Sequence, residues 1–247
     1  MNKVVVVTGG GSGIGKAVVQ KLAMQENFIV YSIDQNDQYS DIPAVRNIKM
    51  DVTDVAAIKN LFYEIGKDGY LYGIVANAGI HQASSKDTDS SAFRKIIDFN
   101  VCLTYDFILE AIPYLRQSKH VQKHAILTSS ASSLKGLATN PAYAASKAAL
   151  DSLVRSLALK FASDKIYFNS VNPGWVETKM FDETLEKYSK STGKTKDDVV
   201  KTFANQGITG KLAKADEVAD LVWLLMSPNQ TSIVGQNIVI DNGYMLR

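Results

Sequence analysis

Residues 3–15 read KVVVVTGGGSGIG, in which four consecutive valines precede a turn that is rich in glycine. The apolar run Lys3–Thr8 is typical of a strand buried on both faces, as in a parallel sheet. Ile14, Val18 and Leu22 then recur at helical spacing. A glycine-rich turn between a strand and a helix lets backbone N–H groups meet a phosphate at the helix N-terminus. We therefore interpret the stretch as a dinucleotide-binding turn, with a plain glycine turn as the alternative.

Strand-like and helix-like stretches alternate along the rest of the chain. This alternation predicts the α/β class, with a doubly wound parallel sheet flanked by helices on both faces. The expected further strands are Phe28–Ile33, Arg46–Met50, Tyr72–Ala76, Ala125–Leu127, Lys165–Val171 and Val234–Ile240. The expected helices beyond the first are Val55–Ile65, Ser90–Leu115, Ala142–Phe161 and Ala215–Met226.

Asp34 ends the second expected strand. An acid about 20 residues beyond the glycine turn, as Asp34 is beyond Gly15, is placed to accept hydrogen bonds from the adenosine ribose. Its charge would repel a 2′-phosphate, and neither Ser12 nor Gln35 supplies a compensating cation. The pattern favours NAD over NADP, while the alternative is an acid in an ordinary loop.

The link between the second and third strands is short. The stretch from Asp34 to Asp51 must itself contain a whole strand, which leaves little chain for anything else. Because a crossover helix needs about a dozen residues, we expect one helical turn or an extended loop there.

A second informative stretch contains Tyr143 and Lys147. Asn140 is a favourable N-cap and Pro141 suits the first helical position, so a helix is expected to begin here. Tyr143 and Lys147 are four residues apart and would therefore share one face of that helix. A tyrosine hydroxyl titrates near pH ~10. A nearby ammonium and the helix N-terminus would favour its phenolate form, as a general base requires.

Spacing alone does not single out this pair, because Tyr63 and Lys67 repeat it. We interpret that second pair as a solvated surface pair. Ser130, however, precedes Tyr143 and comes just after a strand, whereas Met50 holds the equivalent position before Tyr63.

The arrangement of Ser130, Tyr143 and Lys147 resembles the motif of the short-chain dehydrogenase/reductases. That motif is a serine at a strand end, followed at the same spacing by Tyr-x-x-x-Lys. The general G-x-G-x-x-G fingerprint does not fit the glycine turn in register, but the family's T-G-x-x-x-G-x-G pattern fits Thr8, Gly9, Gly13 and Gly15. Further motifs follow in family order as far as residue 243. The resemblance thus implies one Rossmann-type domain over residues 1–247, with about seven strands.

The resemblance also assigns catalytic roles. It implies that Ser130 holds the substrate oxygen, that Tyr143 is the general acid/base, and that Lys147 lowers the Tyr143 pKa and binds the cofactor ribose. Asn100, in the sequence Asp98-Phe-Asn-Val101, matches the family residue that holds a relay water. From its helix position alone, Asn100 reads more simply as a buried asparagine with satisfied hydrogen bonds.

Other positions match the family's cofactor and substrate contacts. Asn77-Ala-Gly79 corresponds to the family's Asn-Asn-Ala-Gly, with Ala76 in place of the first Asn. The implied NAD contacts are Gly9, Ser12, Gly13, Ile14, Gly15, Asp34, Asp51, Val52, Asn77, Ala78, Gly79, Tyr143, Lys147, Pro173, Gly174, Val176 and Thr178. The expected substrate contacts are Ser130, Ser132, His81, Trp175, Met180 and Phe181. The segment over about 179–210 shows little pattern and is expected to be the family's mobile, loop-like substrate-binding segment.

Composition restricts the remaining classes of function. The net charge of +2 indicates no nucleic-acid or other polyanionic partner, and no metal site is expected. The single Cys102 excludes an internal disulfide and favours a reducing compartment, so we expect a cytoplasmic protein. The apolar run Val4–Val7 is too short for a signal peptide, and no run approaches a membrane span. The family often assembles as tetramers, so a homotetramer or homodimer is expected.

The resemblance, with Asp34 favouring NAD, implies an NAD(H)-dependent oxidoreductase that interconverts a secondary alcohol, diol or polyol and a ketone. A non-catalytic dinucleotide-binding regulator on the same fold is the alternative. An enoyl reduction or a sugar epimerisation fits less well. Enoyl reductases of the family commonly space Tyr and Lys further apart, and epimerases carry a longer C-terminal domain.

Overall fold

A computed structural model describes residues 1–36, 41–81 and 90–247 of the chain. Seven strands form one sheet in the order β3-β2-β1-β4-β5-β6-β7, and every neighbouring pair is parallel. The chain begins in the middle of the sheet, runs to one edge and then crosses to the other. This confirms the predicted doubly wound α/β fold, whose strand order reverses between β1 and β4. The strands are β1 (Lys3–Thr8), β2 (Phe28–Asp34), β3 (Val45–Lys49), β4 (Leu71–Ala76), β5 (Lys123–Thr128), β6 (Ile166–Pro173) and β7 (Asn237–Ile240).

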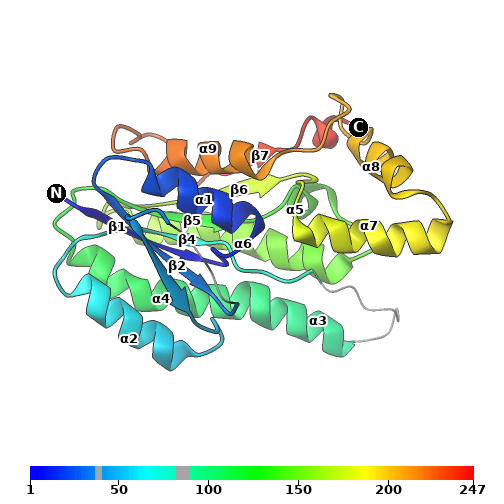
Figure 1. Ribbon diagram of the computed structural model, residues 1–247. Helices are drawn as coiled ribbons and strands as arrows, with labels where there is room; N and C mark the ends of the chain where they lie inside the picture. Colours follow the sequence, from blue (N-terminus) through cyan, green and yellow to red (C-terminus); the bar gives the residue numbers. More distant parts are fainter. Residues whose placement is uncertain (37–40, 82–89) are drawn as a thin grey trace.

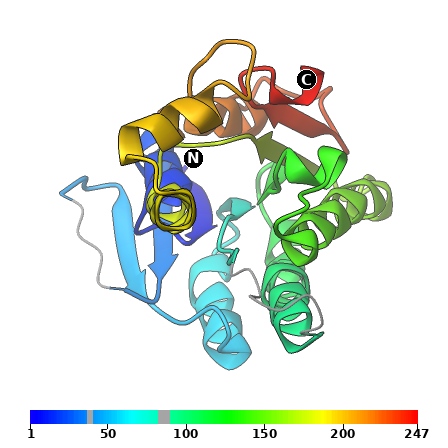
Figure 2. The same ribbon diagram turned by 90° about the vertical axis from the view of Figure 1, so that its right-hand side faces the viewer.

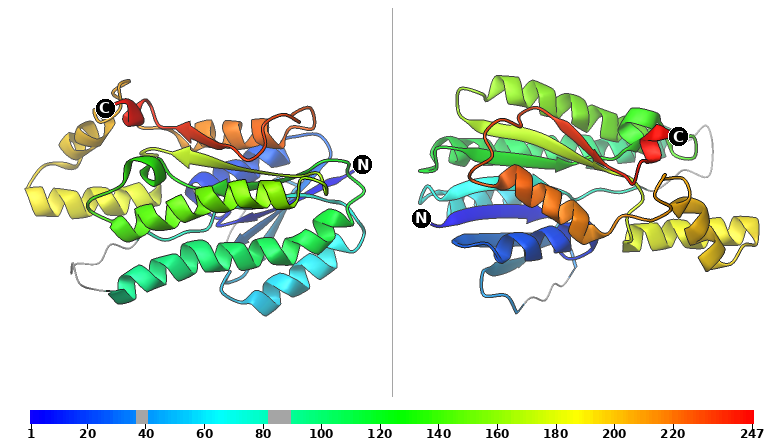
Figure 3. Two further views of the ribbon diagram at one scale, coloured as in Figure 1. Left: turned by 180° about the vertical axis from the view of Figure 1, so that it is seen from behind. Right: turned by 90° about the horizontal axis from the view of Figure 1, so that it is seen from above.

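Helices cover both faces of the sheet (Figures 1 and 3). On one face lie α1 (Gly13–Ala23) and α9 (Ala215–Met226). On the other lie α2 (Val55–Gly66), α4 (Leu103–Arg116) and α6 (Pro141–Lys160). The valines of β1 divide between the two cores: Val4 and Val6 pack toward α2, α4 and α6, whereas Val5 and Val7 pack toward α1 and α9. The unbroken valine run thus results from burial on both faces.

The short link between β2 and β3 contains no helix in its described residues, 35–36 and 41–44. This agrees with the expectation from its length. Ile42 and Ala44 pack against the core on the α1 and α9 face, so the link itself covers part of the sheet there.

The predicted helix Ser90–Leu115 has an irregularity at its centre. It consists of α3 (Ser90–Ile97), a π-helical turn η1 (Asp98–Cys102) and α4. Asn100 lies within the π-turn. Such turns are rare and occur often at functional sites.

The predicted loop-like segment of residues 179–210 instead forms two helices, α7 (Lys179–Thr192) and α8 (Lys196–Ala204). They lie beyond the carboxyl ends of the strands, and Figure 2 shows α7 nearly end-on. Thr178 and Thr195 cap the two helices. The prediction was wrong because scattered apolar residues far apart in sequence build a small core of their own. That core contains Phe181, Leu185, Val199 and Phe203, with Trp175 and Tyr188 packed against it.

Two short elements complete the chain. Helix α5 (Ser132–Lys135) follows β5, and a 3₁₀ turn, η2 (Tyr244–Leu246), lies near the C-terminus. Within the described residues, no helix is long and apolar enough to cross a membrane.

Candidate active site

Ser130 and Tyr143 meet beyond the carboxyl end of β5, where α6 begins. Asn140 is the N-cap of α6: its side-chain oxygen accepts a hydrogen bond from the Tyr143 N–H at 3.2 Å. Its amide nitrogen donates to the His81 carbonyl oxygen at 2.6 Å. This cap ties the first turn of α6 to the segment after β4, and it therefore fixes where Tyr143 enters the site.

The Tyr143 hydroxyl is a hydrogen-bond partner of Ser130. Burial raises the pKa of Tyr143 to about 12, and the hydrogen bond with Ser130 opposes this rise. The Ser130 hydroxyl oxygen also accepts hydrogen bonds from the Ser132 N–H at 3.1 Å and the Ser132 hydroxyl at 2.9 Å. The tyrosine is thus neutral at pH 7, as a proton donor to a substrate oxygen must be.

Lys147 is buried beneath Tyr143. Its Nζ atom donates to the Thr128 carbonyl oxygen at 2.7 Å and lies 5.6 Å from the centroid of the Tyr143 ring. Burial lowers the pKa of Lys147 to about 8, and the charge of Asp151 opposes this change. The sequence predicts that Lys147 lowers the Tyr143 pKa. In the structure burial raises that pKa, and the opposing contribution comes from the hydrogen bond with Ser130.

Asn100 is completely enclosed by protein partners. Its side-chain oxygen accepts from the Ile80 N–H at 2.8 Å, and its amide nitrogen donates to the Ile80 carbonyl at 2.9 Å and the Ser146 hydroxyl at 3.0 Å. Ser146 in turn donates to the Tyr143 carbonyl at 2.7 Å. The buried amide therefore has satisfied hydrogen bonds, and it fastens the segment after β4 to α6. It also lies close to Lys147: a Cβ at Gly79 would be 3.4 Å from Asn100 Oδ1 and 3.5 Å from Lys147 Nζ.

The glycine turn after β1 has the shape of a phosphate cradle. Gly9 and Gly13 have φ angles of +66° and +52°, which favour glycine. A Cβ at Gly15 would collide with the Gly9 carbonyl oxygen, so only glycine fits. Ser12 makes no side-chain cap to α1, and the first N–H groups of that helix remain available to an anion. Thr178 borders the cradle, since a Cβ at Gly13 would lie 3.2 Å from its methyl group.

Asp34 lies at the end of β2 beside this turn, as predicted. One carboxylate oxygen accepts from the Gly11 N–H at 3.0 Å, and the other accepts from the backbone and side-chain amides of Asn36 at 3.0 and 3.2 Å. Asp51 is exposed and accepts from the Thr53 N–H at 2.9 Å, and Val52 packs against the core. The cradle and Asp34 together fit an adenosine dinucleotide, with phosphates at α1 and ribose at Asp34.

The remaining candidate cofactor residues line the ends of β4 and β6. Asn77 donates to the carbonyl oxygens of Thr8 and Gly9 at 3.2 and 3.3 Å, and the Ala78 N–H donates to the Thr8 hydroxyl. These contacts join β4 to the glycine turn. Pro173 is the last residue of β6, and Val176 beyond it forms an isolated bridge with Ala213. Ile14, by contrast, packs at the edge of the α1 core. Gly174 lies so near Asp241 that a Cβ would be 2.8 Å away.

The candidate substrate residues fall into two groups. Ser132 touches Ser130, and His81 Nε2 lies 3.2 Å from the Thr184 hydroxyl on α7, where burial lowers the pKa of His81. Trp175 and Phe181 instead pack in the small core of α7 and α8, with Trp175 Nε1 donating to Gln206 at 2.9 Å. Met180 is 37% exposed. The structure thus places Ser132 beside Ser130, whereas Trp175 and Phe181 pack within the small core that holds α7 and α8 together.

Sequence reasoning missed a buried polar cluster behind Ser130. It is built around Asp151, which lies one helical turn after Lys147 on α6 and is 3% exposed. An acid at that distance from the lysine, on an otherwise apolar helix face, was the signal that could have identified it.

Comparisons with known proteins agree with this geometry. A family model described as Enoyl-(Acyl carrier protein) reductase matches residues 9–245. Dehydrogenase/reductase SDR family member 6 of Rattus norvegicus is 31% identical over 251 residues, covering 99% of this chain and 98% of the relative.

Two solved structures are also similar. A short chain dehydrogenase family protein from Francisella tularensis has a TM-score of 0.90 and 31% identity over the full length of both chains. ElxO, solved with NADP bound, has a TM-score of 0.86 and 26% identity, again over both full lengths. The fold and site define an oxidoreductase that uses a nicotinamide dinucleotide. The chain belongs to the short-chain dehydrogenase/reductase family.

Proposed function

We propose that the protein is an NAD(H)-dependent oxidoreductase that interconverts a secondary alcohol, diol or polyol and a ketone, with Tyr143 as the general acid/base. The observation that carries this proposal is the joint placement of Ser130, Tyr143 and Lys147. The tyrosine hydroxyl meets the serine, and the buried ammonium lies 5.6 Å from the tyrosine ring.

Each residue has a distinct task in this proposal. The Ser130 hydroxyl orients the substrate oxygen, and Tyr143 donates a proton to it during reduction or removes one during oxidation. Lys147 places positive charge beside Tyr143 and donates hydrogen bonds to the cofactor ribose. The side chain of Asn100 is bonded to Ile80 and Ser146, so its role in this proposal is to hold the backbone near Lys147 where a water would link the lysine to solvent. A bound nicotinamide dinucleotide supplies the hydride acceptor or donor.

The preference for NAD over NADP rests on Asp34. Its carboxylate is buried at the end of β2 and already accepts three hydrogen bonds from Gly11 and Asn36. A 2′-phosphate at the same ribose would meet this negative charge at short range, which is strongly unfavourable in a poorly solvated site. A structurally similar protein, ElxO, was solved with NADP bound, so similarity of fold does not decide between the two cofactors. The preference of this chain for NAD over NADP therefore rests on Asp34.

The test replaces Tyr143 with phenylalanine in a screen of secondary alcohols, diols and sugar alcohols with NAD. Loss of one acid/base group lowers turnover roughly 10²–10⁴-fold, while NADH binding, measured by protein fluorescence, is retained. Tyr63→Phe is a matched control because Lys67 Nζ lies 5.8 Å from the Tyr63 ring, but this pair is exposed. Near-normal turnover by Tyr143→Phe would contradict the assignment.

A non-catalytic regulator is the second candidate. The observation that favours it is the high pKa of Tyr143, about 12, because a tyrosine that is neutral at pH 7 can donate a proton during reduction but cannot accept one during oxidation. It predicts tight NADH binding with no turnover of any screened compound by the wild type. Enoyl reduction, suggested by the description of the matching family model, is tested by including an enoyl thioester with NADH. The Tyr-x-x-x-Lys spacing of Tyr143 and Lys147 favours the carbonyl reaction.

We further propose a homotetramer or homodimer in the cytoplasm. The proposal rests on the frequent tetramers of the family; Leu109 on α4 and Leu159 on α6, which are 40% and 83% exposed, are apolar side chains that such an interface would bury. Light scattering tests the oligomer, and a monomeric molar mass at micromolar concentration would contradict it.

A further inference from the structure

Asp151 is a buried carboxylate that takes no part in the reaction described above. It lies on α6, one helical turn beyond Lys147, and is 3% exposed. In the described part of the chain no cationic nitrogen pairs with it, and its partners are neutral: Ser133 Oγ at 2.5 Å, Asn172 Nδ2 at 2.8 Å, Asn237 Nδ2 at 3.0 Å and Ser170 Oγ at 3.2 Å. Burying a carboxylate is costly unless its hydrogen bonds are satisfied.

Two of these partners also hold the active-site serine. Ser133 Oγ lies 2.7 Å from the Ser130 carbonyl oxygen, and Asn172 Nδ2 donates to that same oxygen at 3.3 Å. Asn172 comes from β6 and Ser133 from α5, so the carboxylate joins three elements around the Ser130 backbone. Asp151 thereby holds the backbone of Ser130, from which the reacting hydroxyl projects.

The charge of Asp151 also acts on Lys147. Its surrounding donors are neutral, so no cation neutralises the carboxylate locally, and its field extends along the buried face of α6. Burial lowers the pKa of Lys147 to about 8, and Asp151 acts against that change. The titratable groups facing Lys147 in the described structure are Tyr143 and Asp151, both on α6. The groups that approach from η1 and β5, Asn100 and the Thr128 carbonyl, are neutral.

We propose that Asp151 is a positioning residue of this active site: it fixes Ser130 through Ser133 and Asn172, and its buried charge keeps Lys147 in the ammonium form. The proposal rests on the oxidoreductase function proposed above. An asparagine at position 151 could not replace it, because one side-chain oxygen cannot accept from all four donors and its own N–H₂ would face them.

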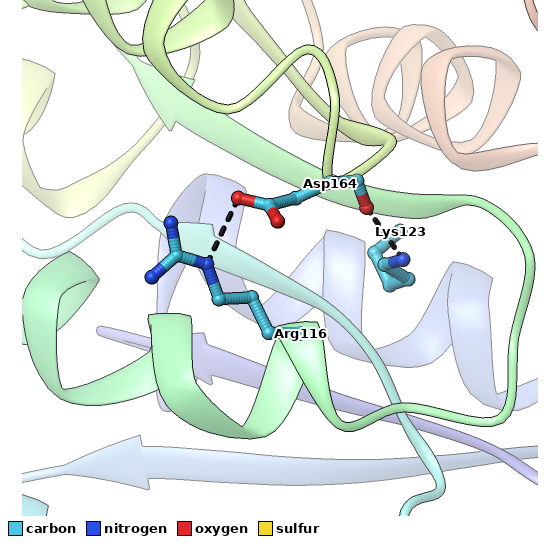
Figure 4. A network of polar contacts seen from close by, with 3 residues as sticks. All are labelled: Arg116, Lys123 and Asp164. Atoms are coloured by element: carbon cyan, nitrogen blue, oxygen red, sulfur yellow. Dashed lines mark hydrogen bonds and ion pairs between the residues drawn. The ribbon is translucent and has the colours of Figure 1, made fainter.

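The first experiment needs neither substrate nor cofactor. Lysine labelled with ¹³C at Cε is followed by NMR from pH 6 to 11, and the Lys147 signal is assigned by its loss in Lys147→Met. In Asp151→Asn the Lys147 pKa falls by roughly half a unit or more. The control is Asp164→Asn. The Asp164 carboxylate pairs with Arg116 at 2.9 Å near the amino ends of the strands, and the Asp164 backbone carbonyl accepts from Lys123 at 2.7 Å (Figure 4). Loss of this carboxylate leaves the Lys147 titration unchanged.

The second experiment separates positioning from charge. Ser133→Ala removes one link between Asp151 and Ser130 but keeps the carboxylate. It lowers kcat roughly tenfold with the Lys147 titration unchanged, whereas Asp151→Asn also moves the alkaline limb of the pH–kcat profile to lower pH. An unchanged Lys147 pKa in folded Asp151→Asn, or full kcat in Ser133→Ala, would overturn the proposal. Failure of the oxidoreductase function itself would be recognised separately, as absence of wild-type turnover beside a normal Asp151-dependent titration.

Discussion

Lys147 donates from Nζ to the Thr128 carbonyl oxygen at 2.7 Å, so the buried ammonium is fastened to the end of β5. This bond holds the charge 5.6 Å from the centroid of the Tyr143 ring. The two residues thereby connect the strand that leads to Ser130 with the helix that carries Tyr143. A lysine held in this way has little freedom to approach the tyrosine hydroxyl more closely.

The first prediction concerns the titration of Tyr143 without cofactor. Burial raises its pKa to about 12, so the ¹³Cζ signal of labelled Tyr143 keeps its phenol position through pH 10. The tyrosine of the unfolded chain ionises near pH ~10. Between pH 10 and 12 the folded chain therefore keeps a proton that the unfolded chain has lost. The contribution of Tyr143 to the free energy of unfolding is fully present below pH 10 and is lost as the pH rises toward 12. NMR with Tyr143→Phe for assignment checks this, and a midpoint near pH 7 would refute it.

The second prediction concerns Asp34→Ala. Removing a charged acceptor of ribose hydrogen bonds costs about 1.5–3 kcal/mol, so NADH binding weakens roughly tenfold or more. NADPH binding strengthens at the same time, because the repulsion of the 2′-phosphate disappears. Fluorescence titration with both cofactors measures the change. The exposed Asp41, in the same link, gives a control variant, Asp41→Ala, that leaves both affinities unchanged. Tighter binding of NADPH than NADH by the wild type would contradict the role of Asp34.

The third prediction concerns the glycine turn. Gly15→Ala places a Cβ against the Gly9 carbonyl oxygen and 2.6 Å from Asn77 Nδ2, so the turn must move. We expect NADH binding to be lost and the free energy of unfolding to fall by about 1–3 kcal/mol. Gly193→Ala is the control, since its φ of +70° gives strain but no atom lies within 4 Å of the added Cβ. Calorimetry should show destabilisation in both variants but loss of NADH binding in Gly15→Ala alone.

Much of the fold could be predicted because the strongest signals are local. The valines of β1 alternate between two cores, and their unbroken run predicts that burial on both faces. The N-cap Asn140 and the helical spacing likewise placed Tyr143 and Lys147 on α6. These features depend on neighbours in sequence, so a single chain reveals them.

Other features depend on contacts between distant segments and could not be predicted. The core of α7 and α8 joins Trp175 to Phe203, whose ring centroids lie 4.5 Å apart. The π-turn at Asn100 is stabilised by hydrogen bonds to Ile80, in the segment after β4. The effect of burial on Tyr143 is equally nonlocal, since it is set by the segments that enclose the ring.

The last prediction concerns His124, at the start of β5. The residue is completely buried, and in the described structure neither ring nitrogen makes a hydrogen bond of good geometry. The Leu225 backbone near the ring opposes the effect of burial only in part. Burial lowers the pKa of His124 to about 4, whereas in the unfolded chain it is about 6.5. Below pH 6.5 the unfolded chain therefore binds a proton that the folded chain does not. Stability is lost as the pH falls from 6.5 to 4, by up to about 3 kcal/mol.

Replacing His124 with leucine removes this contribution and also the unpaired ring nitrogens. We expect the variant to be at least as stable as the wild type at pH 7.5 and clearly more stable at pH 4.5, as measured by urea unfolding. His120→Gln serves as the control, because His120 Nε2 has a partner in the Asn2 carbonyl oxygen at 2.9 Å. Burial also lowers the pKa of His120, so that variant should lose only the His120 contribution and retain the part of the acid sensitivity that comes from His124. An equal loss of stability on acidification in His124→Leu and the wild type would show that His124 titrates normally in the folded chain.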